Sequence, residues 1–293
     1  LDPEGTAGGA IQGHGGRRQH TVKGVTLVKR IFTHSLIALV LSATAGAEVL
    51  TDANEIVARA NLAAYYAGSD GRSEVRMIIS DAQGRQQRRQ FAVLRRNVAE
   101  GGDQQFLVVF SQPSDVRGTA FLVDKHIDRD DDRWLYLPGL DLVKRISAGD
   151  KRTSFVGAHY FYEDVSGRRP ADDDHELVET TDQYYVLRHL PKDTASVEFA
   201  SYTTWIDKQT FLPMKIEYLN SSGKEYRRVE VMEVQEIGGH PTVTTSRVLD
   251  LASGGQTDMQ FRYIQYDLGL PEDIFTERSL RTPPREWLER PAD

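Results

Sequence analysis

The feature that most constrains the fold is a repeated alternation of apolar and polar residues in short segments. In one of them Val75, Met77 and Ile79 occupy every second position, which is the period of a β-strand with one buried face. Turn residues such as Gly101-Gly102 and Ser253-Gly254-Gly255 separate these segments at hairpin spacing. Roughly ten or more such segments follow one another, so the sequence predicts an antiparallel sheet, barrel or sandwich.

Two segments depart from this alternation. Residues 106–110 are apolar on both faces, as in a central strand that is covered on both sides. Residues 51–68 instead place apolar residues at helical spacing. Asp52 and Glu55 fit a capping box at the start of this segment, and Gly68 stands where a C-cap is expected. This is the one clear helix of the sequence, and it either packs on a core or covers a cavity.

The first 47 residues predict export. Residues 1–27 are polar and rich in Gly, and we interpret them as disordered or as lying upstream of the true start. Residues 28–47 fit a secretory signal peptide, with Lys29-Arg30 before an apolar stretch and Ala45-Gly46-Ala47 as the cleavage site. The apolar stretch is shorter than the ~18 residues of a spanning helix, and the alternative is an uncleaved anchor. We expect residues 48–293 to form a single domain in the periplasm.

Composition and missing motifs exclude several classes of protein. The chain has no Cys, which excludes thiol chemistry and disulfides. Its net charge is −7, with Lys and Arg scattered among acidic residues, whereas a nucleic-acid-binding protein would show a basic face. No G-x-S-x-G elbow, P-loop or dinucleotide fingerprint is present. We therefore expect no catalytic residues, no cofactor and no nucleic-acid partner.

Two acidic runs are the candidates for a metal site. Asp128 to Asp132 resembles the start of a calcium-binding loop, but an EF-hand needs Gly at the sixth position and Glu at the twelfth. Arg133 and Gly139 stand at those positions. Asp172 to His175 offers three carboxylates and an imidazole, yet such a run is more often a solvated turn. We therefore expect no bound metal.

Residues 134–164 contain an aromatic-rich run that follows a hairpin and lacks strand alternation. The run includes Phe155, Tyr160, Phe161 and Tyr162. Such a segment is either a buried loop of the core or a flap over an apolar cavity. Aromatic residues pack more often than they bind ligands, so the residues alone favour the core.

The order of motifs in this region resembles the LolA-like outer-membrane lipoprotein-sorting proteins. The motifs are Trp134-Leu-Tyr-Leu-Pro138, Lys144-Arg145-Ile146, Ser154-Phe155-x-Gly157 and Tyr160 to Asp164. They resemble most closely the longer branch that is linked to lipid exporters of the RND type. The resemblance covers roughly residues 48–284. It implies an incomplete β-barrel, in which a strongly curved antiparallel sheet is closed by helices and takes acyl chains on its concave face.

The resemblance also implies a function. It predicts a periplasmic carrier, not an enzyme, that binds lipid or the acyl chains of lipoproteins in an apolar cavity. The carrier would pass this cargo between membranes, or to and from an RND-type exporter, as a monomer in transient contact with membrane proteins. The main alternative is a periplasmic sensor or adaptor that uses the same fold to bind a protein partner, and a filled interior would favour it. A hydrolase would need a catalytic cluster assembled from distant strands.

Strand alternation offers two candidate faces for the cavity, and a register error of one residue exchanges them. We choose the face with the larger apolar side chains. The predicted lining residues are Val75, Met77, Ile79, Phe91, Val93, Phe106, Val108, Phe110, Met214, Ile216, Tyr218, Met259, Phe261 and Tyr263. The predicted lid residues are Ile56 and Ala63 on the helix and Phe155 and Phe161 in the aromatic run. The alternative is that all of them fill a closed core.

Overall fold

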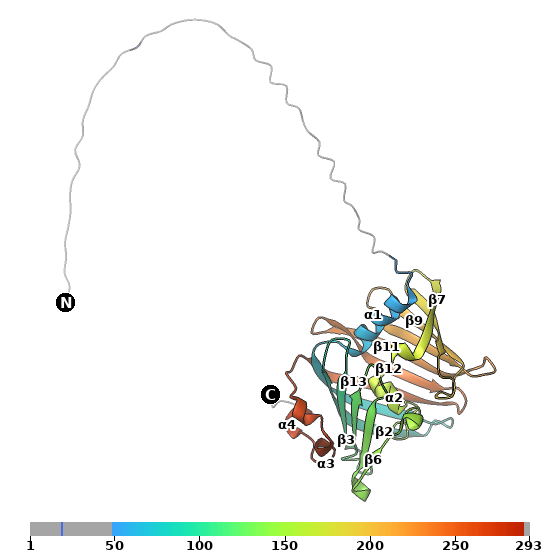
Figure 1. Cartoon of the computed structure of the whole chain (residues 1–293). Coiled ribbons are helices and arrows are strands. Elements are labelled where there is room, and N and C mark those ends of the chain that lie inside the picture. The colour runs from blue at the N-terminus through green and yellow to red at the C-terminus, as the bar shows by residue number, and fades with distance from the viewer. Residues whose placement is uncertain (1–18, 20–48, 290–293) are drawn as a thin grey trace. The chain divides into compact units, whose positions relative to one another are not determined.

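A single antiparallel sheet of 13 strands organises the protein (Figure 1). The computed structural model describes Gln19 and residues 49–289, so the predicted signal peptide lies outside the described residues. The strands follow the order β6-β5-β4-β3-β2-β1-β13-β12-β11-β10-β9-β8-β7 across the sheet. Within the described residues, the edge strands β6 and β7 do not pair with each other, so the curved sheet is not closed into a barrel.

The strand order determines where the connections run. The chain starts in the middle of the sheet at β1, reaches one edge at β6, crosses to the opposite edge at β7 and returns to the middle at β13. The segment between β6 and β7 must therefore bridge the two edges. The strands have these bounds: β1 Asp70–Ser80, β2 Gln86–Asn97, β3 Gln104–Gln112, β4 Ala120–Lys125, β5 Asp132–Leu137, β6 Leu142–Arg145, β7 Asp173–Thr180, β8 Tyr184–Pro191, β9 Ser201–Asp207, β10 Pro213–Leu219, β11 Glu225–Ile237, β12 His240–Asp250 and β13 Gly255–Tyr266.

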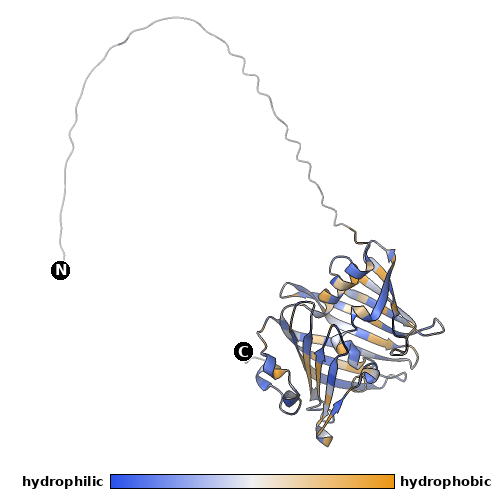
Figure 2. Ribbon diagram, viewed as in Figure 1, coloured by the Kyte–Doolittle hydropathy of each residue, from blue (hydrophilic) through white to orange (hydrophobic). Residues whose placement is uncertain are grey.

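Alternate residues of the central strands point to the concave face, as the sequence predicted. Figure 2 shows apolar and polar positions alternating along these strands. The register brings apolar residues side by side: Val75 of β1 lies opposite Phe91 of β2 and Phe261 of β13, and Phe91 lies opposite Phe110 of β3. Cross-strand pairs of this kind stabilise a sheet. Val75, Phe91 and Phe110 are all buried.

The convex face of β2 to β4 is also covered. Leu94, Leu107 and Leu122 point away from the concave side and are at most 1% exposed. They pack against Phe275 and Leu280 in the C-terminal segment, which contains the short helices α3 (Glu277–Arg281) and α4 (Arg285–Leu288). This second layer explains why residues 106–110 are apolar on both faces.

Helix α1 (Ala53–Tyr65) crosses the open side of the sheet. Asp52 caps it, since its side chain accepts hydrogen bonds from the backbone N–H groups of Asn54 and Glu55. In a capping box the Glu55 carboxylate would also accept from the backbone N–H of Asp52. Among the described residues it pairs instead with Arg59 at 2.5 Å. Ile56 is fully buried against residues of β8 and β9, which anchors the first half of the helix on that side of the sheet.

The segment from β6 to β7 fills part of the concave side. It includes the aromatic run and the short helix α2 (Tyr162–Ser166). Phe155 is 1% exposed, and its ring centre lies 5.7 Å from that of Phe110 and 5.5 Å from that of Phe121. Phe155, predicted as a lid residue, is thus packed among buried aromatic side chains. The sequence could not show that the segment crosses the sheet, because this follows from the order of the strands.

Candidate functional site

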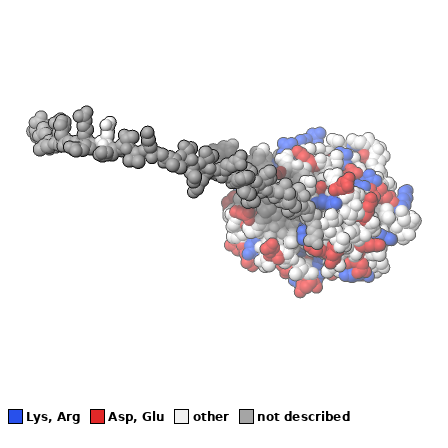
Figure 3. Space-filling model, turned by 90° about the horizontal axis from the view of Figure 1, so that it is seen from above, with Lys and Arg blue, Asp and Glu red and all other residues white. Residues whose placement is uncertain are grey.

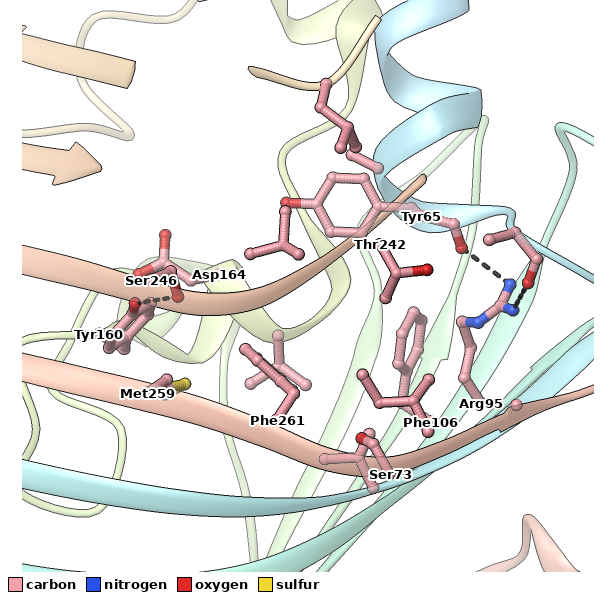
Figure 4. Close-up of a pocket in the computed structure, with 18 of the residues that line it drawn as sticks. Tyr65, Ser73, Arg95, Phe106, Tyr160, Asp164, Thr242, Ser246, Met259 and Phe261 are labelled. Carbon is pink, nitrogen blue, oxygen red and sulfur yellow. Dashed lines mark hydrogen bonds between the residues drawn. The ribbon is translucent and has the colours of Figure 1, made fainter. Parts of the chain in front are cut away.

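A cavity of about 360 Å³ lies between the concave face, α1 and the aromatic run (Figure 4). The sheet contributes apolar side chains such as Phe106 from β3 and Phe261 from β13. The last turn of α1 contributes Ala63 and Ala64, and Ala67 follows two residues after the helix. Small side chains on the helix leave space that larger ones would fill, so the part of the concave side beneath them stays hollow.

Half of the predicted site residues line this cavity. The predicted lining residues found there are Phe91, Val93, Phe106, Val108, Ile216, Met259 and Phe261. The predicted lid residues found there are Ala63 and Phe155. Whether these side chains bind lipid stays a prediction.

Six other predicted residues lie inside packed clusters. Val75, Met77, Ile79 and Phe110 point to the concave side, but there they pack in the same cluster as Phe155. Ile56 belongs to the cluster that anchors α1, and Tyr218 stacks on Tyr202 with ring centres 5.2 Å apart. The predicted lid residue Phe161 also lies outside the cavity wall, where its ring faces the guanidinium groups of Arg152 and Arg227.

Met214 and Tyr263 are displaced by irregularities in their strands. The register of β10 against β9 shifts between Pro213 and Lys215, and the register of β13 against β1 shifts next to Tyr263, which has a φ of 50°. An extra residue in a strand moves the following side chains to the other face. Tyr263 is therefore 53% exposed. The residues that line the cavity in these two regions are Leu212, Pro213, Ile264 and Tyr266.

Sequence reasoning also missed the polar part of the wall. Asp164 and the ring of Tyr65 line the cavity, and Figure 4 shows the Tyr65 hydroxyl pointing into it. The carboxylate of Asp164 accepts hydrogen bonds from Arg227 at 2.5 Å and from the backbone N–H of Phe161 at 2.7 Å. Arg227 compensates the charge of this carboxylate, because a buried carboxylate without a partner is costly. Only the motif from Tyr160 to Asp164 offered a signal for these groups.

Burial keeps Tyr65 neutral. Desolvation, followed by the charge of the nearby Asp164, raises the pKa of Tyr65 well above its usual value. Its hydroxyl has no hydrogen-bond partner among the described residues, so it can both donate to and accept from a ligand. Its ring passes close to Gly167, where an added Cβ would come within 2.4 Å of the ring. Gly167 therefore leaves the space that this tyrosine needs.

Arg95 of β2 ties the end of α1 to the sheet. Its guanidinium donates to the backbone carbonyls of Tyr65, at 2.8 Å, and of Ala67. Gln104 of β3 donates to the same Tyr65 carbonyl at 2.8 Å. The last carbonyls of a helix have no partners within the helix, and these side chains supply them. The cavity-facing half of α1 is thus held largely by polar contacts.

A buried network of ion pairs holds the short helix α2 in place. Glu163 contacts Arg152 at 2.6 Å, Lys151 at 3.3 Å and Arg168 at 3.4 Å. Burial would raise the pKa of Glu163, but the charges of Arg152, Lys151 and Arg168 outweigh burial and lower it to about 2. Ion pairs of this kind offset the desolvation cost of a buried carboxylate only while all partners stay in place.

The acidic runs form ion pairs with basic side chains. Asp131 contacts Arg133 at 2.5 Å, Asp172 contacts Arg169 at 2.8 Å, and Asp173 contacts Arg168 at 2.7 Å. Within residues 49–289 no group of three or more His, Cys, Asp or Glu side chains could hold a metal ion. On the face seen in Figure 3, basic and acidic side chains are interspersed. No helix in the described part of the chain is both long and apolar enough to span a membrane.

Comparison with known proteins relates this architecture to a family. A family model described as "Uncharacterized protein" matches residues 102–282, more than half of the chain. Among solved structures, a DUF1329 family protein from Desulfovibrio piger is 28% identical with a TM-score of 0.72, and covers 78% of this chain and 97% of that one. A putative outer membrane lipoprotein-sorting protein domain from Vibrio parahaemolyticus is 28% identical with a TM-score of 0.70, over 78% of this chain and 98% of that one.

A third solved structure shares the fold. A LolA superfamily protein from Nitrosomonas europaea is 22% identical with a TM-score of 0.61, over 78% of this chain and 99% of that one. Among curated proteins, none matches this chain.

Proposed function

We propose that this chain, which belongs to the family whose model matches residues 102–282 and has a LolA-like fold, is a periplasmic carrier for lipid or for the acyl chains of lipoproteins. The observation that carries the proposal is the cavity of about 360 Å³ under α1, with its largely apolar wall. Protein interiors are normally packed without such voids. An apolar hollow with a few polar groups is the usual form of a small-molecule site.

The energetics of an acyl chain fit this cavity. Each buried methylene contributes ~0.8 kcal/mol, so even part of one chain would bind with useful affinity. Phe106, Phe261 and Ile216 supply apolar contacts from three strands. The Tyr65 hydroxyl and Asp164 can bind a polar group at the end of the cargo.

The contacts of α1 suggest how cargo could enter and leave. The first half of the helix is anchored by the buried Ile56 and Ala60, whereas the second half is tied by Arg95 and Gln104 through hydrogen bonds. Polar contacts exchange with water at a small net cost, typically about 0.5–1.5 kcal/mol each. The end of α1 is therefore the part that can move to admit an acyl chain.

The similar protein from Vibrio parahaemolyticus supports the choice of cargo. It is described as a putative outer membrane lipoprotein-sorting protein domain, and it is 28% identical over 78% of this chain. We extend the proposal to transfer of the cargo to or from an RND-type exporter through transient contact, with the carrier acting as a monomer after removal of its signal peptide near residue 48.

The alternative function is a sensor or adaptor that binds a protein partner. A filled interior would favour it, and the part of the concave side around Phe121 is filled. The hollow part under Ala63 and Ala64 favours the carrier. The two functions differ in one measurable property, which is the binding of a free fatty acid.

A variant that fills the cavity tests the proposal. Replacing Ala63 by Trp places a large ring in the cavity, so we expect the affinity for a fluorescent fatty acid to fall at least tenfold with little loss of stability. Ala195→Trp is the matched control, because Ala195 is exposed and lines neither this cavity nor the other one near α1. Native mass spectrometry of the purified protein should detect co-purified lipid in the parent and the control.

The proposal fails under either of two results. One is a parent protein that neither carries lipid nor binds the fatty acid. The other is an Ala63→Trp variant that is folded and binds as tightly as Ala195→Trp. Either result would favour the adaptor.

A further inference from the structure

A second cavity, of about 440 Å³, lies on a different face of α1. Asn54, Asn61 and Tyr66 of the helix line it together with Lys125 at the end of β4. Residues 169–175 close it on the other side. None of its lining residues lines the cavity proposed for lipid, and its wall carries several charged side chains. It is therefore a separate space with a different chemistry.

Lys125 is the most unusual group in this wall. The residue is 2% exposed, yet its ammonium contacts no carboxylate within 4 Å among the described ion pairs. It donates one hydrogen bond, to the backbone carbonyl of Ser166 at 2.6 Å. It also lies 5.0 Å from the ring centre of Tyr65 and 5.6 Å from that of Tyr66. A buried charge is normally paired, and Lys125 has only this carbonyl and two aromatic faces.

The buried environment lowers the pKa of the Lys125 ammonium. Desolvation lowers the pKa of Lys125 to about 8, although the charge of Asp131 acts in the opposite direction. The group therefore stays largely protonated at neutral pH. It has three N–H donors, and Ser166 uses one of them.

Other charged groups of this wall add to the positive field. The side chain of Lys192 is 53% exposed at the rim, where its ammonium donates to the carbonyl of Ala171 at 3.0 Å and lies 3.8 Å from the Asp174 carboxylate. Arg169 is paired with Asp172 at 2.8 Å. Asp173 is the one carboxylate of the wall.

The carboxylate of Asp173 already has hydrogen-bond partners within the protein. Asp173 accepts a hydrogen bond from Arg168 at 2.7 Å and one from the Tyr202 hydroxyl at 2.6 Å. Burial lowers the pKa of His175, so this imidazole is neutral at pH 7. The cavity thus presents more uncompensated positive than negative charge.

We propose that this second cavity binds a phosphate group, with the ammonium of Lys125 as its central contact. A phosphate offers several strong acceptor oxygens, which match the free N–H donors of Lys125, the rim ammonium of Lys192 and the amides of Asn54 and Asn61. Leu62 and Ile127 line the same space and are 38% and 50% exposed. The phosphate can therefore belong to a free ion or to the headgroup of a lipid.

A titration with inorganic phosphate tests the site in the mature protein. In the parent we expect a saturable rise in Tm that sodium chloride at equal ionic strength does not produce. Lys125→Met should weaken the affinity for phosphate at least tenfold, and Lys192→Met several-fold. Lys224→Met is the matched control, because Lys224 is exposed on a turn remote in sequence, and it should behave as the parent.

Dihexanoyl phosphatidic acid distinguishes the two sources of phosphate. Tighter binding of this lipid than of inorganic phosphate, with competition between the two, indicates a headgroup. Binding of inorganic phosphate alone indicates a free ion. Both outcomes require Lys125, so both support the site.

A direct measurement on Lys125 covers the case in which Lys125→Met does not fold. The 13C NMR shift of its side chain reports its titration, and saturating phosphate should raise its pKa by about one unit or more. Equal effects of phosphate and chloride on Tm, or undiminished binding in a folded Lys125→Met variant, would overturn the proposal. Binding of the fluorescent fatty acid is measured in parallel, so failure here is distinguishable from failure of the carrier function.

Discussion

At the scale of single residues, the buried His189 and the half-buried His175 form a hydrogen-bonded pair that favours the neutral state. Nδ1 of His175 lies 2.7 Å from Nδ1 of His189, and Nε2 of His175 lies 2.9 Å from the carbonyl of Pro170. The carbonyl requires a proton on that Nε2, so Nδ1 of His175 accepts from His189. Nε2 of His189 then accepts from the hydroxyl of Thr204 at 2.7 Å. A further proton on Nδ1 of His175 would place two donors face to face, whereas a proton on Nε2 of His189 would require the Thr204 hydroxyl to turn and accept.

This pair predicts a loss of stability in mild acid. Burial, followed by the charge of His175, lowers the pKa of His189 to about 3, whereas the unfolded chain has a His pKa near 6.5. Below pH 6.5 the unfolded state binds a proton that the folded state resists, so the free energy of unfolding should fall by about 1.4 kcal/mol per pH unit. His189→Gln should flatten the slope of urea-unfolding free energy between pH 6.5 and 5, and His240→Gln should not.

Between pH 6.5 and 5 the histidine pair changes the stability, whereas Glu163 does not yet contribute a change. A lowered carboxyl pKa stabilises the folded state above the unfolded value of about 4.5, and this contribution is lost as pH falls toward 2. Glu163 therefore acts mainly below pH 4.5. An unchanged slope in His189→Gln would show that the pair does not control the response in mild acid.

The residue scale also shows where the sequence was insufficient for the site. Alternation placed Phe91, Phe106 and Phe261 correctly on the concave side, because regular strands keep their period of two. It misplaced Met214 and Tyr263, because each lies at a register shift. A bulge depends on the partner strand as well as on the strand itself, so a single sequence does not reveal it.

At the scale of elements, α1 is the part that the sequence predicted best and the part on which the proposed function depends most. Asp52 caps the helix, and Ile56 lies on its buried face, as expected from a helical period. What the sequence could not show is the partner of its last turn. Arg95 and Gln104 belong to strands whose distance from the helix is set by the curvature of the sheet.

The contact between Arg95 and α1 can be tested by removing the guanidinium. Arg95→Met leaves two backbone carbonyls without this donor, which should cost about 1.5–3 kcal/mol of stability. Amide hydrogen exchange should become faster in the last turn of α1 and stay unchanged around Ile56. Arg88→Met is the matched control on the same strand, where Arg88 is exposed. Equal exchange in both variants would contradict a role of Arg95 in holding the helix.

At the scale of the whole molecule, the concave side is divided into a filled and a hollow part. The aromatic run fills one part, because it must cross from the edge at β6 to the edge at β7. Phe121 and Phe155 are fully buried there. Under the alanines of α1 the other part remains open. The sequence left two alternatives for these side chains, core or cavity wall, and the fold contains both.

This division predicts different costs for two otherwise equal substitutions. Phe121→Ala removes a ring from the filled part and should cost about 3–5 kcal/mol. Phe261→Ala removes a ring that borders empty space, so fewer contacts are lost and the cost should be nearer about 1–2 kcal/mol. The order should reverse for fatty-acid binding, which Phe261→Ala weakens while folded Phe121→Ala retains it. Urea unfolding and probe titration of both variants measure the two quantities, and equal stability losses with equal affinities would mean that the concave side is one continuous core.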